Sequence, residues 1–141
     1  MSRLDENLGS VAFDNLINQN TPEADVFSVP MRAGLGVVTR GTVLALSSGT
    51  GGDAAMVILG TQAIADETLT ANCILAQDVD TGTEAGDPVT ALAYRTGHFN
   101  RNKLTVKTGY TLTKVDEENL RKGGILLDDA VTYKGGMKNG I

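Results

Sequence analysis

The sequence predicts a mainly β protein, built as a small barrel or folded sheet, with one short α-helix and a flexible N-terminal arm. Three observations predict this class. From residue 26 onward, short β-branched and apolar runs alternate with polar or glycine-rich turns. Only one segment carries helix start and stop signals, so the helices that parallel βαβ units require are missing. The first 25 residues have no sustained apolar period.

The arm is predicted to comprise residues 1–25. This segment ends in the turn-prone stretch N-Q-N-T-P-E, and its apolar side chains occur as isolated islands. The islands can dock either as a short helix or as an added strand, and the sequence does not choose between the two. Residues 26–141 are then expected to form one β-rich domain, because a chain of 141 residues has room for one compact core.

Several stretches of the domain are typical of strands. The first, V-F-S-V-P from Val26, alternates apolar and polar residues and stops at Pro30. The next runs from Val37 to Leu46 with Gly41 as a bulge or bend, and the glycine-rich loop S-S-G-T-G-G-D follows it. The remaining predicted strands are A-A-M-V-I-L-G (54–60), A-N-C-I-L-A-Q-D-V (71–79), D-P-V-T-A-L-A-Y-R (87–95), K-L-T-V-K-T-G-Y-T-L (103–112) and G-I-L-L-D-D-A-V (124–131).

One helix is predicted in the stretch L-T-K-V-D-E-E-N-L-R-K-G-G. Thr113 suits the N-cap position, with Asp116 three residues later in a form of capping box. Acidic residues occupy the first turn and basic residues the last, as the helix dipole favours, and Gly123 is placed to end the helix. Val115 and Leu120 are expected to face the sheet.

The core is expected to be modest. Hydrophobic residues make up 41% of the chain, but aromatic residues only 4%, and tryptophan is absent. Small domains with few large apolar side chains gain stability by burying more surface against further copies or a partner, so the composition favours an oligomer. The single cysteine, Cys73, excludes an intrachain disulfide and is interpreted as a buried thiol within a strand.

Charge is unevenly distributed along the chain. The formal net charge of −5 argues against general affinity for nucleic acid. Residues 1–94 carry three basic and twelve acidic residues, whereas residues 95–141 carry nine basic and five acidic ones, an asymmetry that can steer head-to-tail contacts between subunits. No apolar run approaches the roughly 18 residues that a membrane span requires. We therefore expect a soluble protein, made in a reducing cytoplasm, with neither a membrane nor nucleic acid as a partner.

Motifs that carry chemistry are few. The tripeptide Asp80-Thr81-Gly82 matches the D-T-G of aspartic proteases, in which two carboxylates share one proton, and a homodimer could supply the pair. The residues around it do not match the apolar segments of such enzymes, so the homodimeric acid protease is kept as an alternative. G-L-G-V-V-T lacks the third glycine of a dinucleotide-binding fingerprint, and S-G-T-G-G-D lacks the lysine of a phosphate-binding loop. We expect no cofactor.

A metal site is not expected either. One histidine and one cysteine cannot form a Cys/His zinc site. The carboxylates between residues 78 and 87 offer oxygen ligands, but Thr83 occupies the position where a calcium loop needs glycine.

The only histidine lies in Y-R-T-G-H-F-N-R-N-K-L, Tyr94 to Leu104, beside two arginines and a lysine. To act as a general base, His98 would need a hydrogen-bonded partner, and nothing in the sequence supplies one. The three basic side chains could hold a phosphate, yet arginine also pairs with carboxylates at interfaces. A structural or inter-subunit role is the preferred interpretation, with anion binding and catalysis as alternatives.

The order of the segments resembles the head decoration proteins of tailed bacteriophages, the lambda-type capsid-cementing family. The pieces R-G-T-V-L, I-L-A-Q-D-V-D and G-H-F-N-R-N-K-L carry the resemblance, which covers about residues 26 to 131. It implies a fold of the β-clip type and homotrimers on the exterior of the expanded icosahedral head of the virion. It also implies an N-terminal arm that pairs as a strand with the major capsid protein.

The resemblance leads to the hypothesis of a trimeric, non-enzymatic protein that stabilises a phage capsid. The residues expected to bind the capsid are Leu4, Val11, Phe13, Leu16, Ile17, Val26, Phe27 and Val29. The residues expected at the trimer interface are Arg95, His98, Asn100 and Arg101. The alternatives are the homodimeric acid protease, which would use Asp80, and another trimeric virion module such as a tail component.

Overall fold

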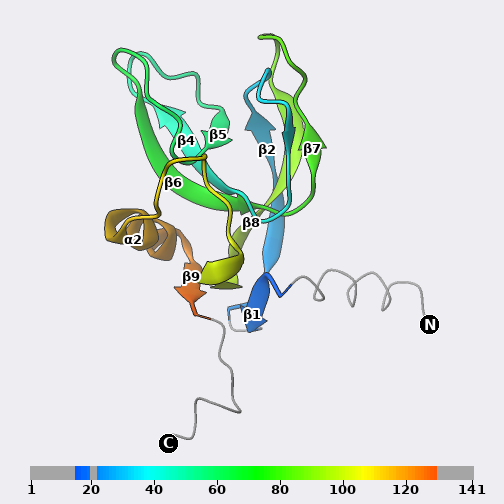
Figure 1. Cartoon of the computed structure of the whole chain (residues 1–141), viewed down its shortest axis with the longest axis vertical. Coiled ribbons are helices and arrows are strands. Elements are labelled where there is room, and N and C mark those ends of the chain that lie inside the picture. Colours follow the sequence, from blue (N-terminus) through cyan, green and yellow to red (C-terminus); the bar gives the residue numbers. More distant parts are fainter. Residues whose placement is uncertain (1–14, 20–21, 130–141) are drawn as a thin grey trace, which may run out of the picture.

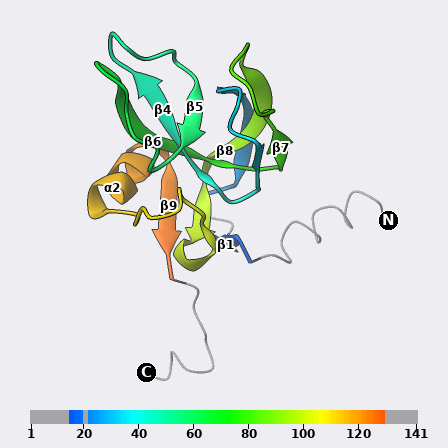
Figure 2. The same cartoon turned by 45° about the horizontal axis from the view of Figure 1, so that its top comes forward.

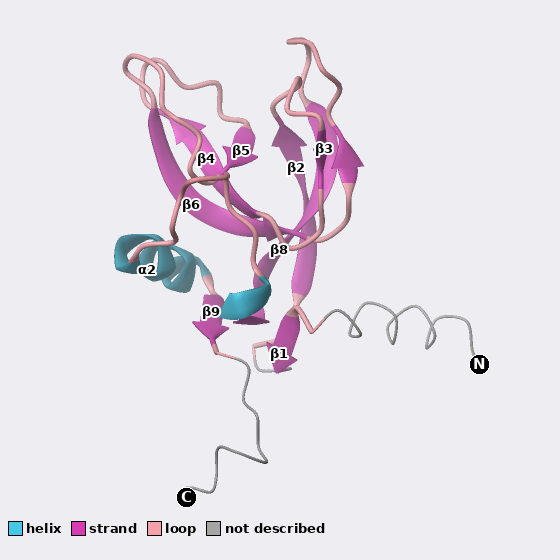
Figure 3. Ribbon diagram, in the orientation of Figure 1, coloured by secondary structure: helices cyan, strands magenta, loops and turns pink. Residues whose placement is uncertain are grey.

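The structure, a computed structural model, describes residues 15–19 and 22–129 of the chain (Figure 1). The described part is mainly β with one α-helix, which confirms the predicted fold class (Figure 3). Its elements in chain order are β1 (Ile17–Gln19), β2 (Asp25–Met31), β3 (Val37–Val38), β4 (Val43–Ser48), β5 (Met56–Ile58), β6 (Thr68–Leu75), β7 (Val79–Asp80), β8 (Val89–Asn100), the 3-10 helix η1 (Arg101–Lys103), the α-helix α2 (Lys114–Gly123) and β9 (Ile125–Asp128).

Five strands close into a small barrel. β8 pairs antiparallel with β2 on one side and with β6 on the other. β6 pairs with β4, and β4 pairs with β5, both antiparallel. The ring is closed by one parallel contact between β5 and β2, in which Met56 lies opposite Met31. Alternating residues of these strands fill the barrel, so its interior is a packed core.

Strand β8 continues beyond the barrel and forms the centre of a second sheet. Its last four residues pair in parallel with β9, and Phe99 and His98 lie opposite β1, which runs antiparallel to β8. Gly97 stands where β8 passes from one sheet to the other. A Cβ atom at Gly97 would lie 2.6 Å from two ring atoms of Phe99, and its φ of +149° is one that other residues rarely adopt. A glycine is therefore required at this position.

The predicted arm of residues 1–25 extends further along the chain than the structure allows. Leu16 is only 2% exposed and belongs to the core, and its carbonyl oxygen accepts a hydrogen bond of 2.8 Å from the backbone N–H of Asn100. Ile17 begins β1, which pairs with β8. Both residues thus belong to the domain. They gave no periodic signal because the segment contributes only a three-residue strand, whose partner lies about 80 positions later in the chain.

Three predicted strands differ from the structure, and one of them, 71–79, is divided between the end of β6 and the start of β7. The run from Val37 to Leu46 is divided into β3 and β4, because Gly41 adopts a φ of +92° in the turn between them. The stretch 103–112 does not form a strand. It crosses the barrel as an irregular segment that is held by backbone hydrogen bonds. The N–H of Val43 donates to Thr105, and the N–H of Lys107 donates to Leu59. These bonds go to two different segments, β4 and the residue that follows β5, so the stretch 103–112 has no continuous partner with which to form a ladder.

The predicted helix is confirmed, with two changes. Thr113 and Asp116 form the capping box, and their reciprocal bonds to backbone N–H groups are both 3.0 Å long. The left-handed residue that ends the helix is Gly124, with a φ of +109°, rather than Gly123. Val115 is 69% exposed, whereas Leu120 is fully buried. The expectation for Val115 was wrong because Asp116, which accepts a hydrogen bond from Tyr110, shares the inward face with Leu120.

Replacing Leu16 by alanine is expected to destabilise the domain by about 2–5 kcal/mol, since it removes a fully packed side chain and leaves a cavity. The free energy of unfolding, measured by urea titration, tests this expectation. Val115→Ala removes an exposed apolar side chain and should change the free energy by less than about 0.5 kcal/mol. Equal effects of the two substitutions would contradict the placement of Leu16 in the core.

Candidate functional site

The molecule has two distinct poles. One consists of the second sheet, β1, the end of β8 and β9, with η1 and α2 beside it, and we call it the strand pole (Figure 2). The other consists of the loops 49–55, 59–67 and 81–88, and we call it the loop pole (Figure 1). β1 is the first and β9 the last described element, so the described chain begins and ends at the strand pole.

The strand pole has two sheet edges. β1 and β9 each pair with β8 on one side only within the described residues. In β1, the side-chain amide nitrogen of Asn18 is buried and has no hydrogen-bond acceptor in this part of the chain. An edge of this kind presents backbone N–H and C=O groups that a further strand can pair with. The strand pole can therefore bind a partner that adds a strand to one of these two edges.

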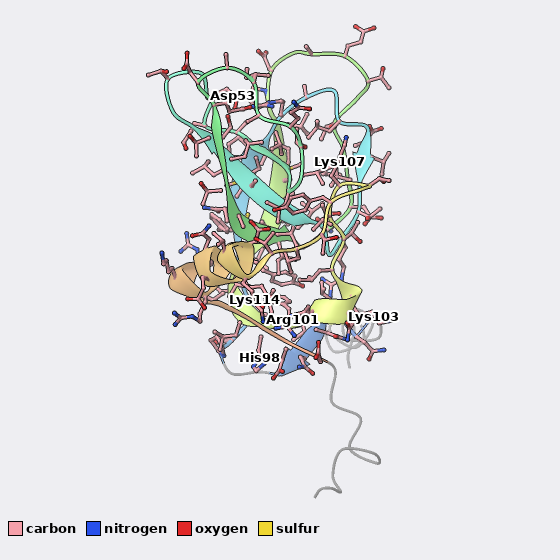
Figure 4. All side chains as sticks on the ribbon, turned by 60° about the vertical axis from the view of Figure 1, so that its left-hand side comes forward. Asp53, His98, Arg101, Lys103, Lys107 and Lys114 are labelled. Carbon is pink, nitrogen blue, oxygen red and sulfur yellow. The ribbon has the colours of Figure 1, made fainter. Side chains whose placement is uncertain are left out.

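Arg101 holds the strand pole together. Its Nε and Nη2 atoms each lie 3.0 Å from a carboxylate oxygen of Glu117 in α2, and its Nη1 donates to Asp129 at 2.8 Å. Nη2 also lies 3.4 Å from the carbonyl oxygen of Leu127 in β9. The two carboxylates raise the pKa of Arg101 above its ordinary value. One side chain thus joins η1, α2 and the end of β9 (Figure 4).

The residues expected at the trimer interface have different surroundings. Arg95 is exposed, and its guanidinium carbon lies 4.6 Å from the ring centre of Phe27. His98 Nε2 lies 3.4 Å from Asp128 Oδ2. Asn100 is only 2% exposed and caps η1 by accepting a bond of 3.1 Å from the N–H of Asn102. Asn100 and Arg101 therefore have structural roles within the protomer.

The residues expected to bind a capsid also differ in where they lie. Leu4, Val11 and Phe13 lie outside the described residues. Leu16 and Val29 are each 2% exposed and belong to the core.

The other three of these residues reach the surface to different degrees. Ile17 and Phe27 are half-buried, and Val26 is 43% exposed. Among the described residues, Val26 lies in the part of β2 that pairs only with β8, because β5 meets β2 at Met31 alone. Within this part of the chain, the other edge of that stretch of β2 is therefore unpaired.

A groove of about 380 Å³ lies between α2 and β9. Its walls carry His98, Glu117, Glu118, Arg121 and residues 125–128. The described residues contain no group of three or more histidine, cysteine, aspartate or glutamate side chains that could hold a metal ion. In the same residues, no helix has the length and apolar character that crossing a membrane requires.

The residues considered for catalysis are buried or form hydrogen bonds that stabilise the fold. Cys73 is fully buried, as expected, and burial raises the pKa of its thiol to about 12. The carboxylate of Asp80 accepts a hydrogen bond of 2.9 Å from the N–H of Gly82. The buried hydroxyl of Thr81 donates to the carbonyl oxygen of Gly36 at 2.7 Å and accepts from the N–H of Leu35. The D-T-G tripeptide thus fixes a turn beside the ribbon of β3 and β7.

A second charged cluster lies at the loop pole, where the sequence offered no signal. Arg32 donates to both carboxylate oxygens of Asp53, at 3.0 and 3.1 Å, and to the buried Glu67 at 2.6 Å. Ser47 donates to the same oxygen of Glu67. A hydrogen bond from Arg32 lowers the carboxyl pKa of Asp53 to about 2, and hydrogen bonds from Ser47 and Arg32 lower that of Glu67 to about 2. These residues are 15 to 35 positions from Arg32, so only the fold unites them.

The cluster makes stability dependent on pH. The carboxyl pKa values are depressed from ordinary values of 3.8 and 4.5, so the stability that the carboxylates contribute is complete above about pH 4.5 and is lost as the pH falls towards 2. Glu67→Gln should therefore lower the free energy of unfolding at pH 6 and have a smaller effect at pH 2.5. Urea unfolding at the two pH values measures the difference.

Glu84→Gln is the matched control, because Glu84 is an exposed loop residue outside the cluster. It should have the same small effect at both pH values. An effect of Glu67→Gln that is equally large at pH 2.5 and pH 6 would contradict the ionised cluster.

Comparison with known proteins adds one match. The family model of the bacteriophage lambda head decoration protein D matches residues 9–133, which is most of the chain. The search of curated proteins finds no match. The matched region contains every described element, and it includes both the strand pole and the loop pole.

Proposed function

Because the chain belongs to the family of the bacteriophage lambda head decoration protein D, we propose that it binds as a homotrimer to the exterior of the expanded phage head. There it cements neighbouring subunits of the major capsid protein and stabilises the shell. The observation that carries the proposal is the family match over residues 9–133. The role is structural, it uses no cofactor, and the protein is made in the host cytoplasm before it joins the outer surface of the virion.

The strand pole faces the shell in this proposal. The described chain begins there, with residues 1–14 preceding it, and these include Leu4, Val11 and Phe13. The N-terminal segment pairs as a strand with the major capsid protein, since added strands gain backbone hydrogen bonds whatever their side chains are. Three such segments on one trimer bind far more tightly than one, because the second and third bind at high effective concentration.

Four described residues of the expected capsid set support this contact. Leu16 anchors the start of the domain in the core, so the segment before it leaves from a fixed point. Ile17 lies in β1, whose outer edge is next to that point. Val26 and Phe27 lie on the open part of β2 and provide a second contact surface.

Arg95 and His98 are assigned to the trimer interface in this proposal. Both belong to β8, and His98 lines the groove beside α2. Asn100 and Arg101 support them by holding η1 and α2 in place.

Removal of residues 2–14 should abolish binding to expanded shells while the trimer still forms. The deletion stops before Leu16, whose loss would damage the core. Losing the multivalent contact should weaken binding by about 100-fold or more. Cosedimentation of purified protein with expanded and unexpanded shells measures the change, and the full-length chain should bind only the expanded form.

The matched control removes residues 130–141, which follow the strand pole at the other end of the chain. This variant should bind expanded shells as the full-length chain does. Retained binding by the chain that lacks residues 2–14 would refute the role of the N-terminal segment. Failure of the full-length chain to bind any shell would refute cementing itself.

A further inference from the structure

Two loops of the loop pole, 49–55 and 59–67, are held to the barrel by polar groups. The structure describes residues 48–54 and 60–66 completely, and every one of them is exposed or half-buried. The residue that follows them, Glu67, is buried, and its side chain is 0% exposed. A segment with few buried apolar contacts opens at a lower cost than the core does. The two loops can therefore move away from the barrel while its core stays packed.

Glu67 fastens the loop 59–67. Its Oε2 atom accepts hydrogen bonds from Arg32, at 2.6 Å, and from the hydroxyl of Ser47. Its Oε1 atom accepts a bond of 3.0 Å from the N–H of Ile64, in the same loop. Arg32 directly follows β2, and Ser47 belongs to β4. One buried carboxylate thus ties this loop to two strands of the barrel.

Asp53 fastens the loop 49–55 to the same two residues. Its carboxylate accepts from Nε and Nη2 of Arg32, at 3.0 and 3.1 Å. Its backbone N–H donates to the hydroxyl oxygen of Ser47 at 3.2 Å. The carboxylate also accepts a bond of 3.0 Å from the N–H of Ala55, at the end of the loop. Arg32 and Ser47 therefore serve both loops, and each loop depends on one carboxylate.

Each loop contains a left-handed residue beside its carboxylate. Ala54, which follows Asp53, has a φ of +64°, and Asp66, which precedes Glu67, has a φ of +63°. This conformation costs free energy in a residue other than glycine, and it persists only where the surroundings hold it. The N–H of Gly51 donates to the carbonyl oxygen of Asp66 at 2.8 Å, so the two loops also contact each other. Loss of the carboxylate bonds would release both strained residues together.

We propose that these two loops, together with Arg32 and Ser47, form a latch that opens in acid when Glu67 and Asp53 lose their charge. Opening is local, and the barrel and the strand pole stay folded. The latch lies far from the strand pole, as the positions of Asp53 and Arg101 in Figure 4 show. The inference goes beyond the proposed function, because it concerns one protomer and a pole to which that function assigns no contact.

The charges around Glu67 give the direction of the pH dependence. Arg32 bonds to it, Asp53 of the other loop lies across the same guanidinium, and Asp66 beside it in the chain is exposed. Bonds from Ser47 and Arg32 hold the carboxyl pKa of Glu67 at about 2, below its ordinary 4.5. Its contribution to closure is therefore complete above about pH 4.5 and is lost as the pH falls towards 2. The pKa of Asp53 is lowered from 3.8 to about 2, mainly by Arg32, so both carboxylates act in the same direction.

The strand pole is held differently, although it also contains an arginine with two carboxylates. Leu120 of α2 and Ile125 of β9 are fully buried, so apolar packing fixes both elements in addition to the bonds of Arg101. Protonation of carboxylates leaves that packing in place. We therefore expect acid to open the loop pole before it affects the strand pole.

Amide hydrogen exchange of the full-length chain at pH 6 and pH 2.5, followed residue by residue by NMR, tests the latch. Each rate is divided by the intrinsic rate at the same pH to give a protection factor. The amides of Gly51, Ala54, Ile64 and Glu67 are hydrogen-bonded in the closed latch, and their protection should fall by about tenfold or more at pH 2.5. The amides of β8 and α2 should keep their protection. Equal losses in β8 and α2 would overturn local opening, and unchanged protection of the loops would overturn the latch.

Glu67→Gln should open the latch at pH 6, because it removes the charge as protonation does. Protection of the same four amides should fall by about tenfold, and the change from pH 6 to pH 2.5 should be smaller than in the wild-type chain. Asp53→Asn is a milder second variant that the fold should tolerate, since the side chain of Asp53 is 50% exposed, and it should reduce the protection by a few-fold.

Glu84→Gln is again the matched control, because Glu84 lies in the third loop of the loop pole, outside the latch. It should leave the protection of the four amides unchanged at both pH values. If Glu67→Gln and Asp53→Asn protect these amides at pH 6 as well as Glu84→Gln does, the carboxylates do not hold the loops and the proposal is overturned.

Discussion

The position of strand β8 is the constraint on which the rest of the structure depends. The strand pairs with β2 and β6 to close the barrel, and it pairs with β1 and β9 to form the strand pole. A change in its register would turn the inward side chains of both sheets outward together. Gly97 makes this dual role possible, because the ring of Phe99 occupies the space that any side chain at Gly97 would need.

This arrangement places two charged clusters at opposite ends of the molecule. The strand pole carries the sheet edges and the ends of the described chain, and Arg101 fixes its geometry through Glu117 and Asp129. The loop pole is stabilised by Arg32 with Asp53 and Glu67, at the other end of the molecule (Figure 4). The remaining groups of chemical interest hold structure, since Cys73 is buried and Thr81 fixes a turn. A structural role in the capsid agrees with this distribution.

Two of the exposed apolar side chains, Val115 and Val37, lie on the flanks of the barrel. Val115 and Val37 contribute nothing to the core of the protomer, although both are β-branched residues within regular elements. An apolar residue at helical spacing predicts a buried face only when the rest of that face is apolar. On α2 the inward face is set by Leu120 and the bonded carboxylate of Asp116, which turns Val115 towards solvent.

The sequence by itself determined the fold class, the position of α2 with its capping box, and the family, because local patterns and the order of short segments carry that information. Only the tertiary structure decided that Leu16 belongs to the core, that the stretch 103–112 is an irregular segment across the barrel, and that Arg32 meets Glu67. Each of these features depends on contacts between residues far apart in the chain, and no local period records such contacts. The barrel closes because β8 meets β2 and β6 and because β5 meets β2, and these pairings exist only in the folded protein.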